Sequence, residues 1–389
     1  MFSELISPVP NSLIESCTIE GKRNIRQFIS IHDELEGMPD FNNCHIALLG
    51  VCEARRAIGN EGQSDSPDLI RKAFYKLFPG DWPLKVADLG NLFPGERPED
   101  TYAALSELSF ELISKNIVLI ILGGSQELTF ALYRAFDKLE HTVNLSSIDA
   151  IFNLGDHSEP LSPSNYLSHI ILNKPYNLFN YSHLAFQTYL LPQEELDLMN
   201  KMQFDLLRLG ELKANLKLAE PLLRDADILS IDLSAMRRSE MPNALNAGAN
   251  GLSNEELCAL CRYAGLSDKL SVAGLFGWDC RVFEDWDEGG IAQAIWYLIE
   301  GIHGRKGDFP FASKKDYLRF AVQINDGEEE LIFFKSPLSG RWWMDVPMRS
   351  LDIKNPGRTS MVPCSEEDYQ RALENEIPER WWRAYNKGL

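Results

Sequence analysis

The segments IVLIILGGSQE (117–127), VNLSSIDAIFNLGD (143–156) and DILSIDLSAM (227–236) decide the fold. Each begins with a run of apolar residues, which is typical of a parallel strand covered on both faces, and each ends in polar residues. The carboxyl ends of parallel strands meet at one edge of a sheet, where open α/β sheets place their sites. The three polar endings are therefore expected to lie together in one site.

Strand and helix patterns alternate along most of the chain. Further strand patterns lie at 45–50, 84–88, 205–210 and 270–276. Alternation of this kind favours βαβ units, so we predict an α/β fold, a three-layer α/β/α sandwich around a mostly parallel sheet. Helical patterns separate the strands, at 101–115, 127–139, 193–203, 215–224, 253–265 and 289–303.

The pattern changes beyond about residue 305. YLRFAVQI (317–324) and ELIFFKS (330–336) flank Asn325-Asp326-Gly327, and Asp-Gly between two β-rich runs indicates a hairpin. Residues 365–376 are predicted to form a helix that begins at Ser365. We therefore expect a small C-terminal extension of a β-hairpin and a helix. The expected division of the chain is an N-terminal segment 1–40, an α/β domain 41–304 and an extension 305–389.

The extension is rich in tryptophan, with Trp342, Trp343, Trp381 and Trp382 in two adjacent pairs. These side chains could pack the extension against the domain, each burying on the order of 200 Å², or they could be exposed anchors for a partner. Packing is the favoured interpretation, because a segment that folds beside a completed domain needs large apolar side chains to stay attached.

The three strand ends resemble the signature motifs of the ureohydrolase family, which includes arginase, agmatinase and formimidoylglutamase. The resemblance extends in order and spacing over roughly residues 40–304, through HIALLGVCEARRAIGNEGQSDSPDLIRKAF (45–74) and SVAGLFGWDCRVFEDWDEGGIAQAIWYLIEG (271–301), and formimidoylglutamase is the favoured relative. It implies an arginase-like fold, hydrolysis of linear amidine C–N bonds, and six ligands that hold two manganese ions. In this chain the six ligand positions fall on Gln126, Asp149, Ile151, Asn153, Asp232 and Ser234.

Only Asp149 and Asp232 keep the ligand type that the resemblance implies. Ile151 cannot bind a metal, and amide or hydroxyl groups are weaker donors to a divalent cation than carboxylates. Two metal ions about 3.5–4 Å apart also need bridging anions to reduce their repulsion. We therefore expect a degenerate manganese site and no cofactor, with Mn²⁺ required only if the chain is a working hydrolase.

Two other groups of residues are candidates for chemistry. His157 and Glu159 could join Asp149 and Asp232 in a shifted single-metal site, although a solvated polar loop is the simpler interpretation. The resemblance also implies a substrate-binding glutamate in the last-strand region. Asp279 could replace it if the register shifts by about one residue.

Composition excludes several classes of protein. A net charge of −19 opposes binding to nucleic acid or to an anionic membrane surface. No apolar run approaches the roughly 18 residues of a membrane span, and the N-terminus lacks a secretory pattern, so a cytoplasmic location is expected. The seven cysteines are scattered and expected to be reduced. Cys258 and Cys261 fit a helix core better than a zinc or redox site.

Three functional hypotheses remain. The favoured one is a pseudoenzyme with a ureohydrolase fold that binds a small amidine-like or amino-acid-like ligand, or acts through assembly such as a homo-oligomer. The second is a metal-dependent amidine hydrolase of the formimidoylglutamase type. The third is a structural or regulatory subunit that uses the Trp-rich tail. The first is favoured because hydrolysis by this route requires a metal to activate water, and function depends on the site rather than on the fold.

Overall fold

The computed structural model describes residues 4–57, 66–139, 142–280, 288–309, 314–325, 329–347 and 361–387. Within them, ten strands form one sheet in the order β1-β4-β3-β5-β10-β9-β6-β7-β8, with β2 paired to β4. Every pair is parallel except β1 with β4. The strands are β1 Ile6–Ser7, β2 Ser30–Ile31, β3 Ile46–Val51, β4 Val86–Leu92, β5 Val118–Leu122, β6 Val143–Ile148, β7 Leu178–Phe186, β8 Asp205–Arg208, β9 Ile228–Asp232 and β10 Val272–Phe276.

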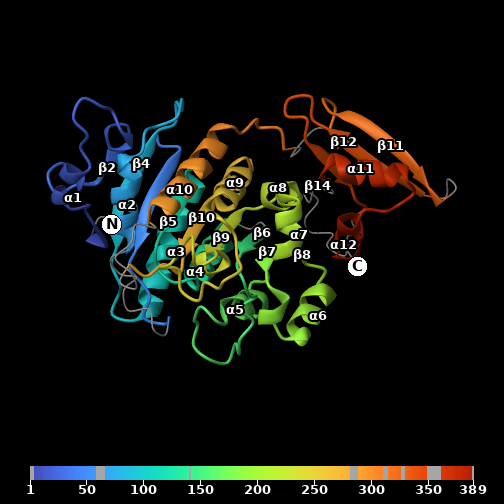
Figure 1. The fold of residues 1–389 in the computed structure, drawn as a ribbon, viewed down its shortest axis with the longest axis horizontal. Coiled ribbons are helices and arrows are strands. Elements are labelled where there is room, and N and C mark those ends of the chain that lie inside the picture. Colours follow the sequence, from blue (N-terminus) through green and yellow to red (C-terminus); the bar gives the residue numbers. More distant parts are fainter. Residues whose placement is uncertain are drawn as a thin grey trace.

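Helices cover both faces of this sheet (Figure 1), so the predicted three-layer α/β/α sandwich is confirmed. In β3, Ile46 and Leu48 enter one hydrophobic core while Ala47 and Leu49 enter the other. One core packs against α1 Asn11–Ser16, α2 Ser66–Lys76, α7 Leu209–Ala214, α8 Ala219–Arg224, α9 Asn254–Gly265 and α10 Glu288–His303. The other packs against α3 Pro98–Ser114, α4 Leu128–Arg134, α5 Tyr166–Leu172 and α6 Gln193–Lys201.

Strand β7 was not predicted, because its centre is polar and interrupts the apolar run by which the other strands were found. Asn180, Ser182 and His183 are nevertheless all buried. Their partners come from neighbouring strands, as where Asn180 Nδ2 donates to Asp205 Oδ2 at 2.8 Å. The predicted strand 205–210 also ends earlier than expected, since α7 begins at Leu209.

The C-terminal extension is larger than the predicted hairpin and helix. It is a four-stranded antiparallel sheet of β11 Leu318–Ile324, β12 Glu329–Lys335, β13 Trp342–Asp345 and β14 Met361–Cys364, with α11 Glu366–Leu373 and α12 Glu379–Lys387. The two hairpin strands pair as predicted, while the turn residues Asp326 and Gly327 lie outside the described residues. Ser365 begins α11 with a capping box, in which its hydroxyl accepts from the N–H of Asp368.

The extension lies beside α8 and β8, at the end of the sheet opposite β1 (Figure 1). Trp343 is only 1% exposed and contacts the domain, because the guanidinium of Arg224 lies 4.6 Å from its ring. Trp342 and Trp381 are buried in the extension's own core, and Trp382 is 42% exposed. Packing against the domain is thus confirmed for Trp343, whereas Trp342 and Trp381 pack within the extension itself.

Two smaller points complete the fold. Cys258 and Cys261 are buried on α9, as expected for core residues, and all seven cysteines are free. No helix among the described residues combines the length and the apolar character needed to span a membrane.

Candidate functional site

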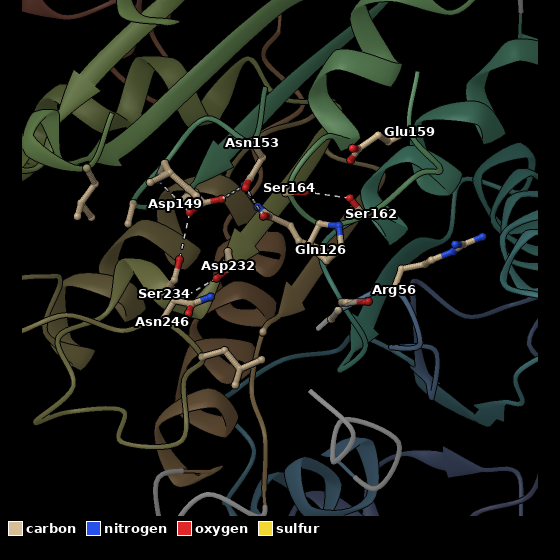
Figure 2. A pocket seen from close by; sticks show the side chains of 18 of the residues that line it. Arg56, Gln126, Asp149, Asn153, Glu159, Ser162, Ser164, Asp232, Ser234 and Asn246 are labelled. Atoms are coloured by element: carbon tan, nitrogen blue, oxygen red, sulfur yellow. Dashed lines mark hydrogen bonds between the residues drawn. The ribbon is translucent and has the colours of Figure 1, made fainter. Parts of the chain in front are cut away.

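The carboxyl ends of β5, β6, β9 and β10 surround a cavity of about 670 Å³. Figure 2 shows its floor, where side chains from these separate strand ends converge. All six positions singled out from the sequence line this cavity, namely Gln126, Asp149, Ile151, Asn153, Asp232 and Ser234. The structure therefore brings the predicted strand ends together at one edge of the sheet.

Local backbone geometry places each of these side chains. Gln126 follows a turn in which Gly123 and Gly124 both have positive φ, at 73° and 79°. A Cβ on Gly124 would lie 2.3 Å from Leu128 Cδ1, so a larger residue does not fit this turn. Asp232 ends β9, and its carboxylate accepts from the N–H of Ser234 at 2.8 Å.

Both oxygens of the Asp149 side chain accept hydrogen bonds from uncharged groups. Its Oδ2 accepts from Asn153 Nδ2 at 2.7 Å, while its Oδ1 accepts from Ser234 Oγ at 3.1 Å and from the N–H of Ile151 at 3.2 Å. Asn153 has a positive φ of 59° and also donates to Gln126 Oε1 at 2.9 Å. Four of the six positions thus form one network around Asp149.

The two carboxyl groups in the floor have pKa values above the usual range for aspartate. Burial raises the pKa of Asp149 well above the usual carboxyl value, and the negative charge of Asp232 raises it further. Burial also raises the pKa of Asp232, to about 6, although hydrogen bonds from Ser234 oppose the shift. The floor therefore carries less negative charge near neutral pH than two ordinary aspartates would carry.

Gly277 closes the floor beside Asp232. It follows β10 with a φ of +79°, and a Cβ added there would lie 3.0 Å from both carboxylate oxygens of Asp232. Glycine therefore permits both the backbone turn and the close approach to the carboxylate.

This donor set does not fit two manganese ions. The two carboxyl groups in the floor supply at most two negative charges, which cannot balance the four positive charges of two manganese ions. Both oxygens of Asp149 already accept hydrogen bonds, and the side chain of Ile151, 37% exposed at the cavity, has no donor atom. Within the described ranges, no three His, Cys, Asp or Glu side chains are grouped to share a metal ion.

The structure does not assemble the shifted site of Asp149, His157, Glu159 and Asp232. His157 is exposed on the loop after β6, and Glu159 lines the outer wall of the cavity, away from both aspartates (Figure 2). The side chain of Asn165 donates to the carbonyl of Asp156 at 2.9 Å, which holds this loop in its outward turn.

Asp279 does not reach the cavity either. It is 4% exposed, its N–H donates to the carbonyl of Asn243 at 2.9 Å, and it is absent from the described lining residues. Gly277 rather than Asp279 faces the site, because the turn after β10 brings the backbone against Asp232.

Among the cavity residues that were not singled out from the sequence are two cations, Arg55 and Arg56. Arg55 Nε donates to Glu53 at 3.0 Å, and Arg56 forms an ion pair with Glu99 at 2.9 Å. Burial of Glu53 opposes ionisation, but the hydrogen bonds from Arg55 outweigh it and lower the pKa of that carboxyl. The available signal was two consecutive arginines soon after a predicted strand, hence at the carboxyl edge of the sheet.

His183, which appeared isolated in the sequence, lies directly behind the site. Its Nε2 is 3.1 Å from the carbonyl oxygen of Asp149 and its Nδ1 is 2.7 Å from the hydroxyl of Tyr181. Burial lowers the pKa of His183 to about 3. A neutral imidazole therefore supports the backbone that carries Asp149.

Asp232→Asn is expected to stabilise the protein at pH 7 by on the order of 1–3 kcal/mol. The folded chain raises the pKa of Asp232 from 3.8 to about 6, so it binds more protons than the unfolded chain between those values. Stability is therefore lost as the pH rises through that window, and Asn removes the loss while keeping an acceptor for Ser234. Urea denaturation at pH 4, 5, 6 and 7 measures the effect.

The matched control for this prediction is Asp156→Asn. Asp156 is exposed, and the N–H of Ser158 lowers the pKa of its carboxyl. Its replacement should not increase stability at any pH tested. If Asp232→Asn also brings no gain at pH 7, the carboxyl of Asp232 does not have the raised pKa assigned to it.

Comparison with known proteins gives a consistent result. The family model described as Arginase family matches residues 44–275. A search of curated proteins found no match. Among solved structures, formiminoglutamase from Trypanosoma cruzi, crystallised with Mn²⁺, superposes with a TM-score of 0.65 at 16% identity, covering 73% of this chain and 99% of that one.

Two further structures resemble this chain in the same way. Formimidoylglutamase from Bacillus subtilis has a TM-score of 0.64 at 15% identity, over 74% of this chain and 94% of that one. Agmatine ureohydrolase from Thermoplasma volcanium has a TM-score of 0.58 at 15% identity, over 73% and 95% respectively. At these identities the likeness shows the fold, and the site must be judged from its own residues.

Proposed function

This chain belongs to the arginase family, and from that premise we propose that its strand-end cavity binds a small amino-acid-like or amidine-like ligand without two-metal catalysis. The observation that carries the proposal is the hydrogen-bond network around Asp149. Asn153 and Ser234 stand at positions where the family resemblance implies metal ligands, and here they donate to Asp149 instead. Such donors satisfy the hydrogen-bonding capacity of the buried Asp149 oxygens without a cation.

The chemistry of hydrolysis supports this proposal. Attack on an amidine carbon at neutral pH requires an activated water, and a bound metal supplies it by lowering the pKa of water from about 15.7 toward 7. A carboxyl group could instead act as a general base, which typically contributes only about 10²–10⁴-fold in rate. Loss of the metal ligands therefore outweighs the activity expected from the fold.

The charges in the cavity indicate the class of ligand. Asp149 and Asp232 lie in the floor, whereas Arg55 and Arg56 line the same cavity, and Figure 2 shows Arg56 well apart from the two aspartates. A ligand with an amidinium or ammonium group at one end and a carboxylate at the other would complement both ends. A cavity of about 670 Å³ has room for a molecule of that size.

Manganese content and ligand binding test the proposal together. After dialysis against Mn²⁺ the purified chain should hold well under one metal ion per chain and should not hydrolyse formiminoglutamate. Formiminoglutamate, glutamate, arginine and agmatine are then screened by thermal shift, and at least one should raise the melting temperature. Asp149→Asn should abolish that shift, while the exposed control Asp156→Asn should retain it.

Two results would overturn the proposal. Stoichiometric manganese with turnover of an amidine would favour the formimidoylglutamase-type hydrolase instead. A complete absence of shifts across the screen, from a folded protein, would show that the cavity does not bind this class of ligand.

The proposal also covers the cellular location of the protein and its self-association. We place the protein in the cytoplasm, because seven cysteines scattered along the chain do not indicate the disulfide framework of a secreted protein. We also propose that the chain forms a homo-oligomer. Light scattering of the full chain tests this by measuring its mass in solution. Burial of Trp342, Trp343 and Trp381 counts against the tail as a partner-binding surface.

A further inference from the structure

A second cavity, of about 470 Å³, lies next to the first along the carboxyl edge of the sheet. Its walls come from the ends of β7 and β8 and from the loop that follows β9. The two cavities share the 3-10 helix η5 Thr188–Leu190, because Thr188 and Tyr189 line the second cavity and Leu190 lines the first. None of the sequence motifs accounts for this second cavity.

All charged side chains in its described lining are cationic. They are Arg208 and Lys213, from the end of β8 and the following α7, and Arg237, from the loop after β9. This is unexpected in a protein with 57 acidic and 38 basic residues. The first cavity contains Asp149 and Glu159, and a third, between α3, α4 and α5, contains Glu99 and Glu107. The second cavity therefore concentrates positive charge against the sign of the whole molecule.

Two of the three cations are poorly neutralised. Lys213 Nζ is paired with both carboxylate oxygens of Glu256, at 2.7 and 2.8 Å. Arg208 is only loosely paired, with Glu211 at 3.9 Å between two exposed side chains. Arg237 is half-buried, and within the described ranges no acidic side chain forms an ion pair with it. Two guanidinium groups thus remain available, and their planar donor pairs match the oxygens of phosphate and carboxylate.

The wall beside these arginines is ordered by its own hydrogen bonds. Gln187, 4% exposed, accepts from the hydroxyl of Tyr189 and donates to the carbonyl of Asn250 at 3.4 Å. Asn250 Nδ2 in turn donates to the hydroxyl of Tyr189 at 3.3 Å. Gly251 lies so close to Arg237 that a Cβ would stand 2.4 Å from its backbone nitrogen. The loop after β9 therefore holds Arg237 against a preformed wall.

We propose that this second cavity is a binding site for a small anionic metabolite that carries a phosphate group or several carboxylates. Arg208 and Arg237 bind the anion, and Lys213 adds positive charge beside them. The site is distinct from the strand-end cavity and does not depend on the function proposed for it. Since η5 lines both cavities, an anion bound here contacts the same segment that closes the first cavity.

Calorimetric titration of the full chain with inorganic phosphate and with citrate tests this proposal. The unmodified protein should bind at least one of them, and the affinity should fall as NaCl is raised from 50 to 200 mM. The phosphate and citrate titrations distinguish the two ligand classes. The double variant Arg208→Gln/Arg237→Gln should weaken binding at least tenfold, because it removes the guanidinium N–H groups that donate to the anion.

The matched control is Arg319→Gln/Arg371→Gln, which removes two exposed guanidinium groups from the extension and leaves both cavities intact. It should leave the affinity for phosphate or citrate within about twofold of the unmodified chain, given that surface charges have small effects. Arg56→Gln is measured beside it to report whether the anion occupies the first cavity. Since Arg208 is exposed and Arg237 is half-buried, the double variant should fold, and its circular dichroism spectrum and melting temperature without ligand verify this.

Three outcomes would overturn the proposal. One is no binding of either anion by the unmodified chain at 50 mM NaCl. Another is equal weakening by Arg56→Gln, which would place the anion in the first cavity. The last is that the double substitution at Arg208 and Arg237 changes the oligomeric mass in solution without changing the affinity for anions. That result would identify this surface as a contact between copies of the chain.

Discussion

The variant Gln126→His/Ile151→His/Asn153→Asp/Ser234→Asp is expected to take up about two manganese ions per chain, where the unmodified chain takes up well under one. The four changes add two imidazoles and two carboxylates to the cavity that already holds Asp149 and Asp232. They also remove the Asn153 and Ser234 donors that occupy the oxygens of Asp149. Elemental analysis after dialysis against manganese measures the gain.

The free energy of unfolding of the same variant provides a second test. Without metal, four carboxyl groups in one floor repel one another, so the variant should be less stable than the parent chain. Manganese at about 100 times its Kd should then restore about 2.7 kcal/mol for each ion bound. Adding Asp232→Asn to the variant should remove most of the uptake. A folded variant that gains no manganese would contradict the convergence of these strand ends.

Trp343→Ala is expected to destabilise the extension by about 3–5 kcal/mol, the usual cost of truncating a buried aromatic side chain. Trp343 is 1% exposed, and its ring meets the guanidinium of Arg224 at 4.6 Å and the ring of Tyr317 at 5.7 Å. Its loss leaves a cavity and exposes one face of the buried Arg224. Urea denaturation, followed by intrinsic fluorescence, measures the change.

Trp382→Ala is the control, since Trp382 is 42% exposed on α12. It should cost less than about 1 kcal/mol, as do most substitutions away from a core. Limited proteolysis shows which part of the chain is destabilised. In Trp343→Ala, cleavage within residues 305–389 should be faster than in the unmodified chain and should precede cleavage of the α/β domain. Equal effects of the two substitutions would contradict the assignment of Trp343 as the contact with the domain.

The order of strands and helices was predictable because periodicity is local. Apolar runs such as 117–122 and 143–149 correspond to β5 and β6 within one residue at each end. β7 was not predicted because the partners that allow its polar residues to be buried include groups distant in sequence, such as Asp205 for Asn180 and the carbonyl of Asp149 for His183. In the extension, β13 and β14 pair with each other across the segment 346–360, which no short-range pattern indicates.

The sequence by itself determined the layered α/β architecture and the meeting of three polar strand ends, since parallel strands covered by helices must place their carboxyl ends along one edge. Tertiary structure alone decided what those side chains do there. It made Asn153 and Ser234 hydrogen-bond donors to Asp149, turned Glu159 away, and brought Arg208 at the end of β8 beside Arg237 from the loop after β9. These outcomes depend on side-chain directions and on partners far apart in the chain, which local patterns do not encode.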